Sequence, residues 1–234
     1  MPILLLWAAG SVAIISESYY LLQRNATSTG KSSRKQALEH SATLLNQFKA
    51  STASAVAIAL LAAVSIAASL FLYPNTAGVF GAALAVIMIW IATVDARRFR
   101  IPNTAVLLAA VLGLFHAGAS EFGSLPNMAF ALARGAILAL MFAALREAYK
   151  LMRGRDGLGF GDVKLAAAAG IWLDFDTAAI TIALASLSGL LFYGCHQYLA
   201  GRALLATNRV PFGLFFAPAI WLGWLFESRW FGTF

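Results

Sequence analysis

Apolar stretches of helical length, separated by short polar turns, make up most of the chain. A helix needs about 20 mostly apolar residues to cross a bilayer. Segments of this kind lie near residues 2–22, 53–73, 77–95, 103–119, 127–148, 162–175, 177–200 and 210–227. The pattern therefore predicts an all-α fold, a polytopic membrane helical bundle of about eight transmembrane segments.

A polar region over residues 23–50 interrupts this pattern after the first segment. Within it, apolar residues between 35 and 48 recur at near-helical spacing, which is typical of an amphipathic helix on a membrane surface. We therefore expect a first transmembrane helix over 1–22, a cytoplasmic loop with an amphipathic helix over 23–50, and a membrane domain over 51–234.

The composition supports this class and excludes several others. Hydrophobic residues make up 61% of the 234 residues and charged residues 12%, whereas soluble domains carry about 25% charged residues. Such a chain has too little polar surface for a water-soluble enzyme, a disordered tail or a coiled coil. Its one cysteine, Cys195, excludes a disulfide framework and a four-cysteine zinc site, and its three histidines lack ligand spacing. We expect no metal and no cofactor.

The basic residues indicate the orientation of the chain. A net charge of +7 could suggest a nucleic-acid partner, but in a membrane protein basic loops mark the cytoplasmic face. Threading the predicted segments through a membrane places 15 of the 17 Lys and Arg residues on one side, and only Arg134 and Arg229 elsewhere. We therefore expect a lipid bilayer and no nucleic acid as a partner, with both termini outside the cytoplasm.

Two aspartates fall on this cytoplasmic side at a similar membrane depth. Asp95 ends the apolar run 77–94, and Asp162 begins the sixth segment. Two carboxylates that face one cavity cannot easily both ionise, so one of them keeps a proton. The ionised group can deprotonate a water molecule while the protonated group polarises a peptide carbonyl. The pair therefore predicts aspartic proteolysis, and the positive end of its helix favours the anionic form of Asp162.

The sixth segment is unusually short. Only 11 residues run from Val163 to Leu173 before the next aspartate, and they cover roughly 17 Å of an apolar core about 30 Å thick. We therefore expect one short or re-entrant segment, with the preceding loop placing its aspartate in a hydrated pocket. Gly159 and Gly161 would let this loop turn tightly and approach another segment closely.

Three short motifs resemble those of the type IV prepilin peptidases, a family of Gly-x-Gly-Asp intramembrane aspartic proteases. Residues 95–103, Asp-Ala-Arg-Arg-Phe-Arg-Ile-Pro-Asn, resemble the family's first aspartate motif. Residues 159–165, Gly-Phe-Gly-Asp-Val-Lys-Leu, resemble the second, and residues 210–213, Val-Pro-Phe-Gly, resemble a Pro-aromatic-Gly element near the family's C-terminus. The motif positions that we expect to shape the site are Gly159, Gly161, Lys164, Pro102, Asn103, Pro211 and Gly213.

This resemblance implies a function and a location. Members remove the short basic leader peptide from prepilin-like proteins at the cytoplasmic face of the bacterial inner membrane, and the motif match gives Asp95 and Asp162 as the catalytic pair. Longer, bifunctional members also carry paired zinc-binding cysteines in an N-terminal cytoplasmic region and methylate the new N-terminus. Here residues 23–50 contain no cysteine, so the resemblance is to the compact, peptidase-only members and methyl transfer is not implied.

Other interpretations of the same residues remain open at this stage. Asp95 could pair with Arg97 or Arg98 at the interface, and Asp162 could simply cap its helix, where Asp is a favoured residue. The two carboxylates could also serve a secondary transporter as a proton or cation relay, although the sequence shows no repeat symmetry. A third possibility is a non-catalytic scaffold in pilus or secretion assembly.

Packing predictions complete the sequence-based interpretation. Gly135, Gly170 and the alanines at 166–169 predict close helix packing around the sixth segment. Lys164 is expected to be a basic anchor at the interface. The tryptophans are expected mostly at interfacial or lipid-facing positions, namely Trp7, Trp90, Trp172, Trp221, Trp224 and Trp230.

Overall fold

The computed structural model of the chain describes residues 54–119, 125–154, 157–199 and 211–230. The predicted first helix and the amphipathic helix lie outside these ranges. The chain divides into two compact units, Met1–Val64 and Ser65–Phe234. Of the first unit only the start of the helix Ser54–Leu72 is described. The predicted domain boundary at residue 50 stays a prediction.

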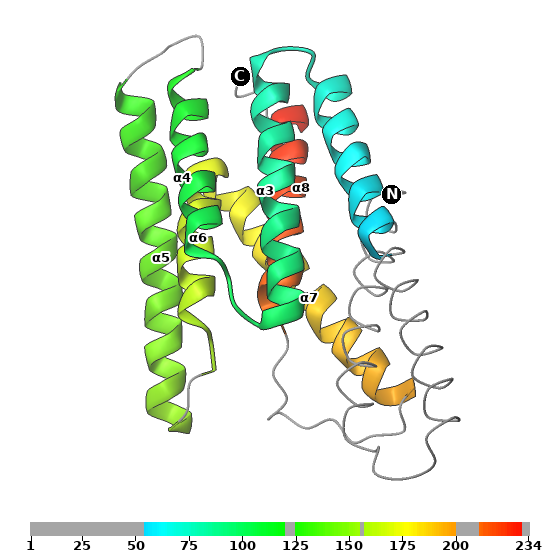
Figure 1. The fold of residues 1–234 in the computed structure, drawn as a ribbon. Coiled ribbons are helices and arrows are strands. Elements are labelled where there is room, and N and C mark those ends of the chain that lie inside the picture. Colours follow the sequence, from blue (N-terminus) through cyan, green and yellow to red (C-terminus); the bar gives the residue numbers. More distant parts are fainter. Residues whose placement is uncertain (1–53, 120–124, 155–156, 200–210, 231–234) are drawn as a thin grey trace, which may run out of the picture. The chain divides into compact units, whose positions relative to one another are not determined.

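The described residues form helices joined by short connections (Figure 1). After Ser54–Leu72 come α3 (Thr76–Arg98), α4 (Asn103–Gly118), α5 (Leu125–Arg153), α6 (Phe160–Trp172), α7 (Phe175–Leu199) and α8 (Phe212–Trp230). The predicted segments therefore all form helices from residue 54 onward, and the all-α prediction is confirmed for this part of the chain.

Four of these helices are long and apolar enough to cross a membrane: Ser54–Leu72, α3, α5 and α7. The chain is therefore a multi-pass membrane protein. Helices α4 and α6 contain 16 and 13 residues, so they extend about 24 Å and 20 Å, less than an apolar core of about 30 Å. The short sixth segment is thus confirmed, whereas the total of eight spans stays a prediction.

Helix α6 lies among four other helices. It packs most extensively on α5 and α4 and also contacts α7 and α8. The contact with α5 depends on two glycines, because a Cβ on Gly170 would lie 2.8 Å from the carbonyl oxygen of Arg134 and a Cβ on Gly135 would lie 2.8 Å from that of Ala167. The predicted close packing of small residues is confirmed, and the helix that packs closely against them is α5.

Aromatic side chains fill the core beyond α6. Trp172, Trp221 and Trp224 are 3%, 0% and 1% exposed, so the expectation of interfacial or lipid-facing tryptophans is wrong for these three. Trp172 donates its indole N–H to the carbonyl oxygen of Ala109 at 2.8 Å, and its ring lies 5.1 Å from that of His116. Apolarity alone cannot tell a lipid-facing indole from a buried one, whereas a hydrogen-bond partner on a neighbouring helix favours burial.

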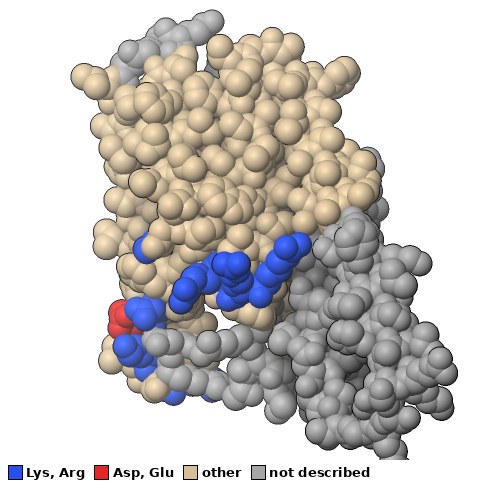
Figure 2. Space-filling view, in the orientation of Figure 1, with Lys and Arg blue, Asp and Glu red and all other residues tan. Residues whose placement is uncertain are grey.

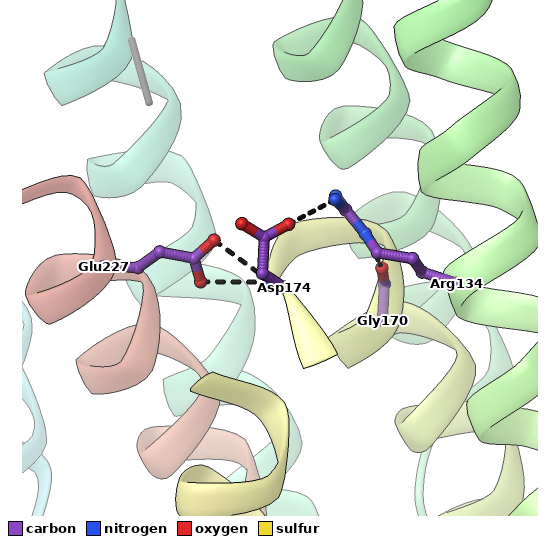
Figure 3. Close-up of polar contacts among 4 residues, drawn as sticks. All are labelled: Arg134, Gly170, Asp174 and Glu227. Carbon is purple, nitrogen blue, oxygen red and sulfur yellow. Dashed lines mark hydrogen bonds and ion pairs between the residues drawn. The ribbon is translucent and has the colours of Figure 1, made fainter. Parts of the chain in front are cut away.

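A polar cluster holds the C-terminal end of α6 (Figure 3). Glu227 of α8, which is 5% exposed, accepts the backbone N–H of Asp174 with both carboxylate oxygens, at 3.0 and 3.2 Å. Arg134 of α5 pairs with the Asp174 carboxylate and donates from Nε to the carbonyl oxygen of Gly170. Three helices are therefore tied together where α6 ends.

Charge is concentrated at the other end of the helices. The last turn of α3 carries Arg97 and Arg98, and that of α5 carries Lys150 and Arg153. On the face in Figure 2 the Lys and Arg side chains gather toward the lower end, and the larger area above them carries other residue types. This distribution agrees with the one-sided basic loops of the sequence.

The contact between α5 and α6 gives a first prediction. Gly170→Ala should lower the free energy of unfolding by about 1–3 kcal/mol, because the added Cβ would lie within 2.9 Å of the α5 backbone. Gly194→Ala in α7 is the matched control, since nothing lies within 4 Å of its Cβ position and Ala is favoured over Gly in a helix. Thermal unfolding in detergent measures both, and equal destabilisation would contradict the close packing.

Candidate active site

The site is built where α3 ends and where α4, α6 and α8 begin. Asp95 lies in the last turn of α3 and Asp162 in the first turn of α6. The connection Phe99–Pro102 reverses the chain between α3 and α4, and Phe99 adopts the left-handed conformation with φ 50°. Alternating helix directions bring these ends to the same side, as the sequence predicts.

Asp95 is bound by the start of α8. The carboxylate is 5% exposed, and its Oδ2 accepts the backbone N–H of Leu214 at 3.1 Å. Leu214 is in the first turn of α8, whose free N–H groups and positive dipole end stabilise an anion. Within the described residues no ion pair joins Asp95 to Arg97 or Arg98, so the interpretation of Asp95 as an interfacial partner of these arginines is wrong.

Asp162 is partly accessible and hydrogen-bonds its own turn. Its Oδ2 accepts the N–H of Gly159 at 3.2 Å, three residues earlier. Asp162 is therefore not the N-cap residue that the capping interpretation expected, because Gly159 holds that position and Asp162 lies at N3, from which it accepts the N–H of the N-cap residue. A capping carboxylate can still react, because it has further acceptor positions.

The two carboxyl groups interact electrostatically. Asp162 lies outside the four candidate spans. Desolvation and the negative charge of Asp95 raise the pKa of Asp162 from its ordinary value of 3.8 to about 7. The expected preference for the anion at the helix N-terminus is thus outweighed, since burial and a neighbouring like charge both favour the protonated form. Sequence motifs 67 residues apart therefore supply one interacting pair.

The motif glycines provide space and do not require unusual backbone angles. Gly159 has φ −71°, and among the described glycines only Gly154 has a positive φ. A Cβ on Gly159 would lie 3.1 Å from Oδ2 of Asp162, and one on Gly161 would lie 3.0 Å from Cβ of Ile101. The expected tight turn is wrong as a reason for these glycines, whereas the expected close approach of another segment is observed.

The remaining motif residues also meet here. Lys164 donates from Nζ to Oδ1 of Asn103 at 2.9 Å and lies 4.9 Å from the centre of the Phe160 ring. This bond joins the first motif to the second. It gives Lys164 a contact in addition to its predicted role as an interfacial anchor. Pro102 is the N-cap residue of α4, in extended conformation and without a side-chain capping hydrogen bond.

The C-terminal motif reaches the site through α8. Pro211 is buried immediately before this helix, and a Cβ on Gly213 would lie 2.8 Å from Oδ2 of Asp95. Two residues were not identified as site residues from the sequence, Leu214 and Ile101. The signal for Ile101 is its place between Arg100 and Pro102 as an apolar residue in a polar turn. Among the described residues no three His, Cys, Asp or Glu side chains lie together as a metal site would need.

Comparison with known proteins matches this region. Residues 82–194, which include both aspartates, match the model of the type IV leader peptidase family. This part of the chain is similar to that family. A prepilin leader peptidase/N-methyltransferase of Aeromonas salmonicida is 35% identical over 99 residues, which cover 39% of this chain and 32% of that protein. A protein of the same name from Aeromonas hydrophila is 37% identical over 97 residues, covering 40% and 33%.

A shorter relative extends this comparison. The leader peptidase HopD of Salmonella typhimurium is 34% identical over 84 residues, which cover 36% of this chain and 54% of that protein. The chain therefore spans about a third of the Aeromonas relatives and about half of HopD. No solved structure matches it significantly. These names give no support to the transporter or scaffold alternatives. The family match ends before Gly213, which the sequence predicts as a site residue and the fold places beside Asp95.

The electrostatic pair gives a second prediction. Asp95→Asn should lower the pKa of Asp162, because removing a neighbouring negative charge makes ionisation of Asp162 easier. Asp162 stays buried in this variant, so its pKa should stay above 3.8. Infrared difference spectra recorded against pH would follow the protonated carboxyl band, with Asp162→Asn used to assign it. An unchanged titration in Asp95→Asn would show that the two groups do not interact.

Proposed function

We propose that this protein is a membrane aspartic endopeptidase that removes the basic leader peptide from prepilin-like proteins. The observation that carries this proposal is that the end of α3, which carries Asp95, and the starts of α6 and α8 meet around Ile101. Both aspartates lie within the residues that match the family model, and the charge of Asp95 contributes to the raised pKa of Asp162. Both carboxyl groups lie where the described basic residues gather, at one end of the helices.

The chemistry follows from two carboxyl groups that share a site. They titrate as a coupled unit, and at intermediate pH one carries a proton while the other does not. The charged group deprotonates a water molecule, which attacks the scissile carbonyl, while the protonated group donates a hydrogen bond to the carbonyl oxygen. Asp95 is held in place by α8, whereas Asp162 is partly accessible.

The proposed location is the bacterial inner membrane, with the site facing the cytoplasm. Its support is the basic residues at the end where the aspartates lie, since such residues mark the cytoplasmic side. A substrate would then keep its basic leader in the cytoplasm and its apolar segment in the bilayer. The proposal covers the peptidase step, and the polar region 23–50 has no cysteine for the zinc site of the bifunctional members.

Cleavage in cells tests this function. Co-expression with a prepilin-like protein that has a basic leader, a glycine and then an apolar helix should shorten that protein, as mass spectrometry can show. Asp95→Asn and Asp162→Asn should each reduce the rate by about 10³-fold or more, since neither half of a catalytic pair works alone.

Asp176→Asn is the matched control for these two variants, because Asp176 is an exposed carboxylate at the start of α7. It should cleave as the unmodified chain does. An intact leader in the presence of the unmodified, well-expressed chain would refute the function. Cleavage that survives in either aspartate variant would refute the mechanism.

The bond between Lys164 and Asn103 gives a separate prediction. Lys164→Met and Asn103→Ala should each slow cleavage by about 2–10-fold, the equivalent of one hydrogen bond. The double variant should be no slower than the slower single variant, because both changes remove the same contact. Lys150→Met, a basic residue at the same end of α5, is the control and should cleave normally. Losses that multiply in the double variant would show that the two residues act separately.

A further inference from the structure

Ile101 is a buried apolar residue in an otherwise polar turn. It is 8% exposed, whereas Arg100 before it and Asn103 after Pro102 are exposed. Phe99 in the left-handed conformation reverses the chain after α3, and Pro102 restricts the residue before it to extended backbone. The β-branched side chain of isoleucine also has few rotamers. The turn therefore presents a stiff side chain inward.

That side chain touches the two motif glycines on either side of the aspartate pair. A Cβ on Gly161 would lie 3.0 Å from Cβ of Ile101 and 3.3 Å from its Cγ1 and Cδ1. A Cβ on Gly213 would lie 2.9 Å from Cδ1 of Ile101. Because each glycine lacks a side chain, both backbones rest directly on Ile101.

Each of these glycines is next to a residue that places one aspartate. Gly161 directly precedes Asp162, and Gly213 directly precedes Leu214, whose N–H binds Asp95. A change in the size of Ile101 would shift the start of α6 relative to the start of α8. The distance between the two carboxyl groups would change with it.

We propose that Ile101 is a positioning residue, a spacer whose side chain sets the separation between Asp162 on α6 and Asp95 held by α8. This proposal rests on the proposed peptidase function. One contact partner, Ile101, then explains why two separate motifs each have a glycine, at Gly161 and at Gly213. It also makes Ile101 and Gly161 interdependent in size, because the two share one space between α4 and α6.

A double-variant experiment tests this interdependence. Ile101→Ala should lower kcat about tenfold and leave KM within about twofold, because the proposed spacer acts on the separation of the two carboxyl groups and not on substrate binding. Gly161→Ala should also lower kcat about tenfold, because its new Cβ meets Ile101. The combined Ile101→Ala/Gly161→Ala variant should be faster than either single variant, since the methyl group added at 161 fills part of the space vacated at 101. Ile101→Val, which lacks only Cδ1, should retain more activity than Ile101→Ala.

Two controls separate the spacer from general packing. Ile137→Ala makes the same truncation at a side chain of α5 that is 44% exposed, and it should cleave normally. Gly213→Ala should stay slow with either residue at 101, because Oδ2 of Asp95 lies 2.8 Å from the new Cβ whatever the size of residue 101. The melting temperature in detergent is recorded for every variant, so that unfolded protein is not scored as slow enzyme.

The outcomes distinguish the two proposals. Cleavage by the unmodified chain together with losses that multiply in the Ile101→Ala/Gly161→Ala variant overturns the spacer and leaves the peptidase function standing. No cleavage by the unmodified chain overturns the peptidase function and with it any role of Ile101 in catalysis. A rise in kcat of the double variant above both single variants supports the spacer.

Discussion

The carboxylate of Asp95 ends a long apolar helix, and the backbone N–H of Leu214 at the start of α8 is its hydrogen-bond partner. A buried carboxylate without a partner is costly, so α3 and α8 must meet at this point. The two residues are 119 positions apart in the chain. Closing this contact fixes one aspartate against the start of a second helix, and the rest of the site is arranged around that fixed group.

Helix α6 is the other half of the arrangement, and its shortness matters. With 13 residues it begins and ends at polar anchors on different neighbours. At its start Lys164 reaches Asn103, and at its end Asp174 is bound by Glu227 and Arg134. Between these anchors the small residues admit α5 closely. A longer apolar helix could slide along its neighbours, whereas this one is fixed at both ends.

The sequence predicts the helices well because apolar length and polar turns are local signals. It also predicts both aspartates and the motif residues around them, through chemistry and a family resemblance. It does not predict that Leu214 binds Asp95, because the donor is a backbone N–H group, which nearly every residue type has. Nor does it predict that Glu227 is buried at the end of α6 or that three tryptophans are in the core, because these depend on which helix faces lie together.

The reason for the two motif glycines, Gly159 and Gly161, differs from the one that the motif suggests. A Gly-x-Gly-Asp sequence suggests a flexible loop, yet neither Gly159 nor Gly161 adopts a positive φ. Their positions are explained by what lies against them, a carboxylate oxygen and the side chain of Ile101. The requirement is space for close approach, and such a requirement is invisible until the neighbouring segment is in place.

The alignment of the two carboxyl groups therefore depends more on α6 than on α3. Asp95 is held by a separate helix, so its position is fixed by a contact across the fold. Among the residues that the structure describes, the Asp162 carboxylate hydrogen-bonds only Gly159 in its own turn, so Asp162 moves with α6 as a unit. Any displacement of α6 changes the separation of the pair without breaking either hydrogen bond. It follows that, if the proposed peptidase function holds, the residues at the two ends of α6 and along its glycine face control the separation of the catalytic pair although most of them do not touch it.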